Sequence, residues 1–276
     1  MPLPLYSRQP PDSTSAIRES LGLENSAKGS SLILLIFCKL RPIKEIQREE
    51  MFNAWRQCVL CHYTLWKAGI HHRDISCDKL MYYRAINGKV IGVLNDCDLA
   101  SLADTPGRSE NKRTGAIPFM AIDLLKPDGQ AGLVKHIYRH DMESFIWVFI
   151  WLCFQYKDGK FHHGPLDEWA KVDADQCAAK KNFFLSYPQK PSYLTHAGWF
   201  RLNTLGNYLA VRSYFRVHHN LKLSAAQSLL AIYGPTAEHQ EEIKRLEAKL
   251  VEESDDVVFD GFIGKIDAVA SAVVDD

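Results

Sequence analysis

The feature that most constrains the fold of this chain is a continuous apolar run, Phe145–Phe154. It contains three phenylalanines and two tryptophans, so a helix formed from it is apolar on nearly every side. Such a helix belongs in the middle of a core. The run is too short to cross a bilayer, because a spanning helix needs about 20 apolar residues. We therefore expect a globular fold built around a helix over residues 141–154.

The segments before this run predict one long helix and one hairpin. From Glu45 to Lys67, apolar residues recur every three or four positions, which is typical of an amphipathic helix. Leu80–Tyr83 and Val90–Leu94 are short β-prone segments, and Asn87-Gly88 between them favours a tight turn. Residues 31–40 form an apolar run that suits a buried strand. The expected fold class is therefore mainly α, and α+β overall.

Composition divides the chain into three parts. Residues 1–30 are rich in Ser, Pro and Gly and predict a disordered leader. Residues 31–232 carry the predicted central elements and form the main domain. Residues 233–276 predict a helical, acidic tail, with a charged helix over 238–253. Within it, the acidic run Glu252–Asp256 is most simply a solvated segment.

Charge and cysteine usage limit the classes of partner. Lys and Arg total 33, and Asp and Glu also total 33, so the net charge is zero. We therefore expect neither nucleic-acid binding nor attachment to a membrane surface. The N-terminus shows no secretory signal, and the seven cysteines are scattered and odd in number. These features predict reduced thiols in a cytoplasmic or nuclear protein.

One cysteine pattern has a second interpretation. The run from Cys58 to His62 matches the C-x-x-C-H pattern of c-type haem attachment. Haem attachment of this kind accompanies export, whereas the pattern here lies inside a predicted helix whose apolar face explains it. A zinc site from Cys58, Cys61, His71 and His72 is also weak, because adjacent histidines lack the usual ligand spacing. A packed helix is the simpler prediction.

Two carboxylates stand where the chain could bring them together. Asp74 ends the tripeptide His72-Arg73-Asp74 after the first long helix, and Asp96 follows the predicted hairpin. A hairpin sends the chain out and back, so both side chains can face one cleft. Phosphoryl transfer needs such a pair, because one carboxylate orients the attacking hydroxyl and another holds Mg²⁺ against the phosphates. The sequence therefore favours this chemistry.

A long loop over residues 96–123 follows, and loops of this length inside a domain are usually functional or disordered. Arg73 could pair with a phosphate on this loop and order it. The candidate phosphate acceptors are Ser101, Thr105, Ser109 and Thr114.

At this point the chain resembles the fungal-type protein kinase family, a divergent branch of the protein kinase-like fold. The resemblance covers about residues 31–200. The segments that carry it are Leu40-Arg41-Pro42-Ile43, Trp55-Arg56-Gln57-Cys58-Val59, His72-Arg73-Asp74-Ile75-Ser76, Leu94-Asn95-Asp96-Cys97-Asp98-Leu99-Ala100, Pro118-Phe119-Met120-Ala121 and His140-Asp141-Met142-Glu143-Ser144-Phe145. It implies the C-terminal lobe of a kinase, with a short hairpin and most of the N-terminal lobe missing.

The resemblance also implies roles for individual residues. Asp74 is then the catalytic aspartate, with His72 and Arg73 beside it, and Asp96 binds magnesium. Asp141 braces the catalytic loop from the head of the central helix. A hinge near Cys38–Leu40 implies that both end residues contact the nucleotide. The implied cofactors are ATP and Mg²⁺, and the implied partner is a Ser/Thr-containing protein substrate.

The chain departs from the family pattern at several positions. Five positions after Asp74 the pattern has Asn, a ligand of the second Mg²⁺, but this chain has Lys79, a cation that would repel the metal. Lys79 could instead contact a phosphate of the nucleotide, and Asp78 could replace the missing metal ligand. Ile122-Asp123 stands where Pro-Glu is usual, and Asp123 keeps the negative charge.

The upstream part of the pattern is also missing. Residues 1–30 contain no Gly-rich loop, no strand lysine and no helix glutamate of the kind that grip ATP. We therefore expect little or no phosphoryl transfer by this chain alone, because loss of such residues costs several orders of magnitude in rate. The alternative function is a catalytically impaired pseudokinase, or a truncated kinase fragment, that acts as a binding module for a kinase partner. The sequence does not indicate the oligomeric state.

Overall fold

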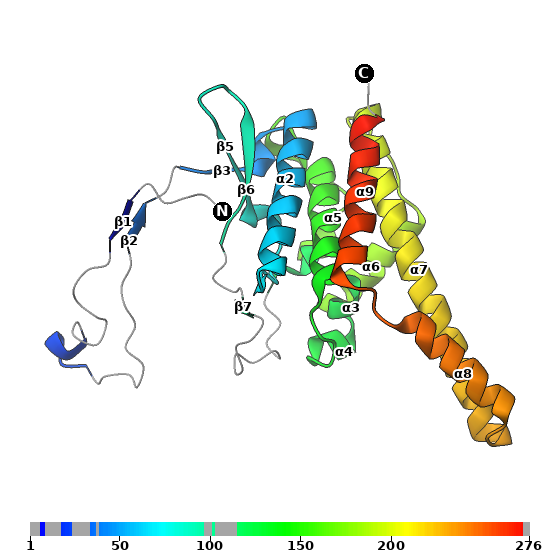
Figure 1. Ribbon diagram of the computed structural model, residues 1–276. Helices are drawn as coiled ribbons and strands as arrows, with labels where there is room; N and C mark the ends of the chain where they lie inside the picture. Colours follow the sequence, from blue (N-terminus) through cyan, green and yellow to red (C-terminus); the bar gives the residue numbers. More distant parts are fainter. Residues whose placement is uncertain are drawn as a thin grey trace.

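The computed structural model describes residues 6–8, 18–23, 34–36, 39–96, 101–102 and 115–272. The described part is mainly helical, as expected (Figure 1). Its α-helices are α2 (Arg48–Lys67), α3 (Ile122–Leu125), α4 (Pro127–Gln130), α5 (Tyr138–Gln155), α6 (Ala174–Ser186), α7 (His196–Tyr233), α8 (Ala237–Leu250) and α9 (Asp255–Ser271). Short 3-10 helices are η1 (Ile43–Glu45), η2 (Cys77–Lys79), η3 (Ile117–Phe119) and η4 (Asp167–Ala170).

The strands are short and pair antiparallel. They are β1 (Tyr6–Arg8), β2 (Leu34–Ile36), β3 (Arg41–Pro42), β4 (Ile70–His71), β5 (Leu80–Arg84), β6 (Val90–Leu94), β7 (Ser101–Leu102), β8 (Tyr156–Lys157) and β9 (Lys160–Phe161). The pairs are β1 with β2, β3 with β5, β5 with β6, β4 with β7, and β8 with β9.

Helix α5 forms the centre of the core, as the apolar run predicted. Every residue from Tyr138 to Gln155 is buried. α2 packs beside it, and the indole of Trp55 donates a hydrogen bond to the carbonyl oxygen of Phe145 at 3.0 Å. The Trp55 ring also lies 5.0 Å from that of Phe149. The Phe145 carbonyl oxygen gives the buried indole N–H a hydrogen-bond partner, and without one the burial of this polar group would be unfavourable.

The long helix and the hairpin form where the sequence predicted them. α2 begins at Arg48, three residues later than expected, because η1 takes up the residues before it. In the hairpin, Leu80 pairs with Leu94 and Arg84 with Val90. Gly88 supplies the positive φ of +80° that the turn requires.

The N-terminal strands differ from the expected leader. Tyr6–Arg8 lies inside the predicted leader, yet it pairs with Leu34–Ile36 as β1 and β2. The predicted run over 31–40 is therefore a strand only in its middle among the described residues. The predicted end of the leader at residue 30 therefore separates β1 from β2, although these two strands pair. They pair because the backbone of an apolar strand needs a neighbour for its hydrogen bonds.

Gly92 on β6 allows the hairpin to approach α2. A Cβ atom at this position would lie 2.1 Å from the carbonyl oxygen of Ala54, a backbone atom that cannot turn aside. The amide oxygen of Gln57 also accepts a hydrogen bond from the Gly92 N–H at 3.1 Å. Backbone approach at this distance leaves room for glycine alone.

We expect Gly92→Ala to lower the free energy of unfolding by about 3 kcal/mol or more, as overpacking against rigid backbone does. Urea denaturation followed by circular dichroism measures this change. Gly264→Ala on α9 is the matched control, because nothing lies within 4 Å of its Cβ position. A Gly92→Ala variant as stable as the Gly264→Ala variant would contradict this packing.

The C-terminal helices correct one prediction. α7 and α8 form a hairpin that projects from the body, and α9 then returns to pack beside α7 and α5 (Figure 1). Side chains of α9 also contact α2. Phe262 and Ile266 of α9 are fully buried in the same core as Trp55. The C-terminal part is thus helical, as expected. The predicted division at residue 232, however, does not separate two hydrophobic cores, because α9 belongs to the same core as α5.

The run Glu252–Asp256 is mostly exposed, as predicted, but several of its carboxylates also have partners in the fold. Asp255 accepts a hydrogen bond from the Trp66 indole at 2.8 Å, and Asp256 pairs with Lys67 at 2.8 Å. The end of α2 presents these donors, so the acidic residues fasten the start of α9 to it. Glu252 also pairs with Arg139. None of the helices in the described ranges is long and apolar enough to cross a membrane.

Candidate active site

The tripeptide His72-Arg73-Asp74 lies in the loop between β4 and η2. The His72 ring is buried, and its Nδ1 accepts a hydrogen bond from the Asp74 N–H at 3.3 Å. Its Nε2 therefore carries the proton and donates to the carbonyl oxygen of Asn95 at 3.2 Å. Burial lowers the pKa of His72, which keeps the ring neutral near pH 7. His72 thus joins the loop that carries Asp74 to the segment that carries Asp96.

A buried carboxylate at the head of α5 braces this loop. Asp141 is 1% exposed and accepts a hydrogen bond from the backbone N–H of Arg73 at 3.2 Å. It also accepts from His62 at 2.8 Å and from His136 at 2.7 Å. Arg73 has a φ of +62°, a strained conformation for a residue with a side chain. The bond to Asp141 stabilises this conformation, in the bracing role that the sequence predicted.

The environment of Asp141 keeps it ionised. Burial opposes ionisation, but His136 and His62 outweigh burial and hold the pKa of the Asp141 carboxyl well below its ordinary value. Hydrogen bonds from three directions make the charge compatible with a core position.

Asp74 and Asp96 converge on the ammonium group of Lys79. The Lys79 Nζ lies 3.7 Å from Oδ2 of Asp74 and forms an ion pair with Asp96. Asp74 is 10% exposed and Asp96 34%, so the pair faces a partly open site. Asn95 donates its backbone N–H to the carbonyl oxygen of Lys79 at 2.9 Å, which holds η2 against the end of β6. The hairpin therefore brings the two carboxylates together, as predicted.

These motifs agree with a comparison against known families. Residues 34–153 match the fungal protein kinase family. This match confirms the resemblance over those residues, which include the catalytic-loop tripeptide, Asp96 and Asp141. The chain thus contains a protein kinase-like domain.

Among solved structures, the chain is similar to the PK-1 kinase of the Cydia pomonella granulovirus, with 14% sequence identity and a TM-score of 0.43. The similarity covers 67% of this chain and 65% of that kinase, so the chain spans less than two thirds of the length of the kinase. No curated protein matches the chain at a significant level.

The remaining predicted site residues lie elsewhere in the kinase-like domain. Asp78, proposed as a substitute metal ligand, is 78% exposed and pairs with Lys44 at 2.9 Å. Its neighbour in η2, Lys79, lies beside Asp74 and Asp96 instead. Leu40 lines a shallow surface hollow with Arg41 and Glu45, and Cys38 lies outside the described residues.

The proposed phosphate acceptors are only partly described. Ser101 is in β7, whose backbone pairs with His71. Thr105, Ser109 and Thr114 lie outside the described residues. The candidate partner Arg73 lines a small hollow with Asp74, Gly115 and His136. Its Nε has no hydrogen-bond partner among the residues that the structure describes.

The cysteine pattern in α2 packs into the core. Cys58 is fully buried, and burial raises the pKa of its thiol above the ordinary range. His62 is also buried, lies against Tyr138 and Phe145, and donates to Asp141. The helix thus uses these residues in packing and in support of the catalytic loop.

Magnesium has suitable ligands at the carboxylate pair. Mg²⁺ is usually held by one or two carboxylates together with substrate phosphates, and Asp96 and Asp74 offer such oxygens. In the part of the chain that the structure describes, no group of three or more His, Cys, Asp or Glu side chains could hold a metal by itself. The two carboxylates therefore fit one Mg²⁺ that arrives with a nucleotide, provided that the Lys79 ammonium moves aside or contacts a phosphate.

Two buried residues with ionisable side chains, which sequence reasoning missed, fasten the segment Met120–Ile122. Lys181 of α6 is fully buried and donates to the carbonyl oxygen of Met120 at 2.5 Å. Glu143 of α5 accepts from the Ile122 N–H at 2.8 Å and from the Trp147 indole at 3.0 Å. Glu143 lies two residues before the apolar run Phe145–Phe154, a position that could have revealed it. No sequence pattern marks Lys181.

The setting of Lys181 is unusual for an amine. Its Nζ lies 4.8 Å from the centre of the Trp147 ring and 5.7 Å from that of Trp169. Burial lowers the pKa of Lys181 to about 8, although Cys177 and Glu143 oppose the shift. The aromatic faces and the Met120 carbonyl partly replace the water that the ammonium loses.

Proposed function

We propose that this chain is a protein kinase-like domain that transfers a phosphoryl group from ATP to Ser or Thr of a protein substrate. The observation that carries the proposal is the convergence of Asp74 and Asp96 on the Lys79 ammonium, with Asp141 bracing the loop that carries Asp74. This is the arrangement of carboxylates that phosphoryl transfer requires. The match of residues 34–153 to fungal protein kinases supports it.

Each residue of the group has a distinct task in this proposal. Asp74 orients the attacking hydroxyl and accepts its proton. Asp96 supplies oxygens to Mg²⁺, which neutralises phosphate charge when bound. Lys79, the departure from the family pattern, contributes positive charge beside the transferred group. Its ammonium already lies between the two carboxylates, where a phosphate would need a cation.

A second candidate function is a binding module with impaired catalysis. The ion pair of Lys79 with Asp96 favours it, because this carboxylate must leave its cation to bind a metal. In this case the domain would act through a kinase partner. The two candidates differ in whether the carboxylate pair binds Mg²⁺ and ATP.

Thermal unfolding with and without millimolar Mg-ATP tests the proposal. We expect Mg-ATP to stabilise the chain, by about 2.7 kcal/mol at 100 times its dissociation constant. Asp96→Ala should remove this stabilisation, because the metal loses its main ligand. Asp78→Ala is the matched control and should keep it, because Asp78 pairs with Lys44 outside the group. ATP with EDTA in place of Mg²⁺ gives the metal-free reference.

Each outcome distinguishes the candidates. A magnesium-dependent shift that disappears in Asp96→Ala supports the proposed kinase chemistry. Equal loss in Asp78→Ala would move the metal site to η2 and overturn the assignment. If the chain unfolds cooperatively and Mg-ATP does not change its unfolding temperature, the binding module is the better candidate function.

A further inference from the structure

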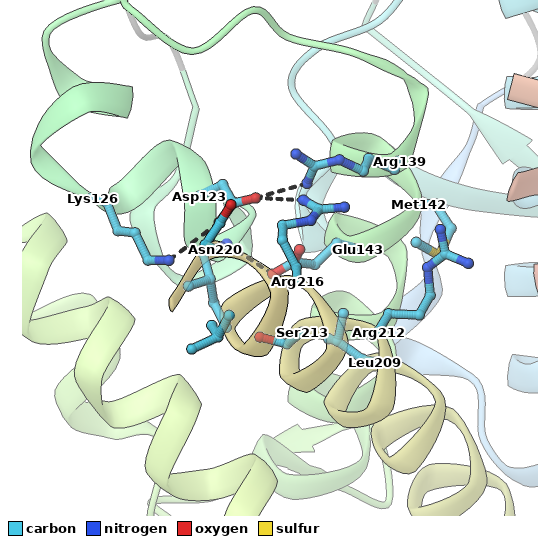
Figure 2. Close-up of a pocket in the computed structure, with 12 residues that line it drawn as sticks. Asp123, Lys126, Arg139, Met142, Glu143, Leu209, Arg212, Ser213, Arg216 and Asn220 are labelled. Carbon is cyan, nitrogen blue, oxygen red and sulfur yellow. Dashed lines mark hydrogen bonds and ion pairs between the residues drawn. The ribbon is translucent and has the colours of Figure 1, made fainter. Parts of the chain in front are cut away.

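A hollow lined by basic residues contains none of Asp74, Lys79 and Asp96 in its lining. It is enclosed by α3, α5 and α7, and Figure 2 shows the side chains that face it. Four of its lining residues are cationic: Lys126, Arg139, Arg212 and Arg216. These cations come from α5, from α7 and from the residue that follows α3, so only the tertiary structure gathers them.

Within the hollow, one carboxylate faces three of these cations. Asp123 pairs with Arg216 at 2.6 Å, Arg139 at 2.9 Å and Lys126 at 3.3 Å (Figure 2). Burial opposes its ionisation, yet the two arginines hold the pKa of the Asp123 carboxyl well below its ordinary value. The hollow is lined by four cationic residues and two acidic ones, Asp123 and Glu143, so its positive charge is in excess and attracts further anions.

A second hollow continues the first, because Arg212 and Arg216 line both. Its other wall is the linker between α8 and α9, which places two consecutive glutamates against the arginines. Glu252 binds Arg139 through both of its oxygens at 2.9 to 3.1 Å and lies 3.7 Å from Arg216. Glu253 pairs with Arg212. The two hollows together form one arginine-lined groove.

The acidic linker is held at the surface of this groove. Glu252 is 48% exposed and Glu253 is 47% exposed. The linker has no helical structure, because α8 ends at Leu250 and α9 begins at Asp255 with Ser254 as its N-cap. Arg139 is 9% exposed and Arg212 24%, so each pair joins a half-exposed glutamate to a more buried arginine. Another acidic segment can therefore replace the two glutamates from the solvent side and keep the arginines paired, while both helices stay intact.

We propose that this groove is a binding site for an acidic segment of a partner protein, and that Glu252-Glu253 occupies it within the chain. Guanidinium groups match carboxylates and phosphates through paired hydrogen bonds, and the linker shows that the groove accepts two consecutive acidic side chains. The site is separate from the Asp74–Asp96 group, so the inference does not depend on the proposed phosphoryl transfer.

Fluorescence anisotropy with a labelled peptide that contains four consecutive glutamates tests the site on the full chain. Glu252→Gln/Glu253→Gln removes the charges that compete within the chain. We expect it to bind the peptide about tenfold more tightly than the unmodified chain, since two half-exposed ion pairs no longer compete. Glu241→Gln/Glu242→Gln on α8 is the matched control, because Glu242 pairs with Arg245 away from the groove. It should bind like the unmodified chain.

Adding an arginine substitution to the linker variant locates the binding. Arg212→Gln should return the affinity to the unmodified level or below, and it leaves the pairs of Asp123 with Arg139 and Arg216 in place. Arg245→Gln is its control and should change nothing. A peptide with glutamine for glutamate should not bind, and one with phosphoserines compares phosphate with carboxylate.

Two results would overturn the proposal. One is equal peptide affinity for the Glu252→Gln/Glu253→Gln and Glu241→Gln/Glu242→Gln variants. The other is tight binding that survives Arg212→Gln. Thermal melting of each variant confirms that it is folded before its affinity is compared.

Discussion

Replacing Asp141 with alanine should lower the free energy of unfolding by about 3–5 kcal/mol, the cost of breaking a buried charge network by removing one partner. Asp141 accepts hydrogen bonds from His62, His136 and the Arg73 backbone, and the variant leaves all of these donors buried without an acceptor. Chemical denaturation at pH 7 measures the change. Asp175→Ala, at an exposed position in α6, is the control and should change stability by less than about 0.5 kcal/mol.

The pH dependence of this effect has a definite sign. The pKa of Asp141 is lower in the folded chain than in the unfolded chain, where it is about 3.9. Its stabilising contribution is therefore complete above about pH 4 and is lost as the pH falls toward the folded pKa. The stability difference between the unmodified chain and Asp141→Ala should shrink in acid. A difference that is small at pH 7, or that grows in acid, would contradict the proposed bracing role.

Replacing Asp74 with asparagine should reduce phosphoryl transfer about 10²- to 10⁴-fold, which is the usual contribution of a general base. Asparagine keeps the size of the side chain but cannot accept the hydroxyl proton. The measurement is transfer of labelled phosphate from ATP to a generic Ser/Thr protein substrate. Because the sequence predicts little transfer by this chain alone, the assay needs high enzyme concentration and long incubation.

Two comparisons make this result interpretable. Asp78→Asn, with its side chain directed to Lys44, should keep the activity of the unmodified chain. Lys79→Asn restores the residue type of the family pattern and tests whether the lysine limits magnesium binding. Equal transfer by Asp74→Asn and the unmodified chain would mean that the phosphate comes from another enzyme. No transfer by any variant would favour the binding-module candidate.

Local patterns in the sequence were sufficient to predict the main elements. The apolar run predicted the buried α5, the three- and four-residue spacing predicted α2, and Asn87-Gly88 predicted the turn between β5 and β6. These predictions succeed because periodicity and turn chemistry act between residues that are close in the chain. The position of Asp74 and Asp96 in one group followed from the hairpin for the same reason.

Predictions failed where the partner of a residue lies far away in the chain. Asp255 looked like part of a solvated run, but its partner Trp66 is on α2. No sequence pattern predicted the buried position of Lys181, because its partners are far away in the chain. They are the carbonyl of Met120 and the ring faces of two tryptophans. Asp78 and Lys79 are neighbours in sequence, yet only their surroundings show which one joins the carboxylate pair.

The sequence by itself thus determined the central helix, the hairpin, the kinase-like motifs and the residues available for chemistry. Only the tertiary structure decided that α9 completes the core, that Asp141 binds two histidines, and that α5 and α7 together supply the arginines of the groove. The physical reason is the distance over which each kind of interaction acts. Backbone preferences and hydrophobic periodicity act over a few residues, whereas charge pairing and burial depend on distances in space that the whole fold sets.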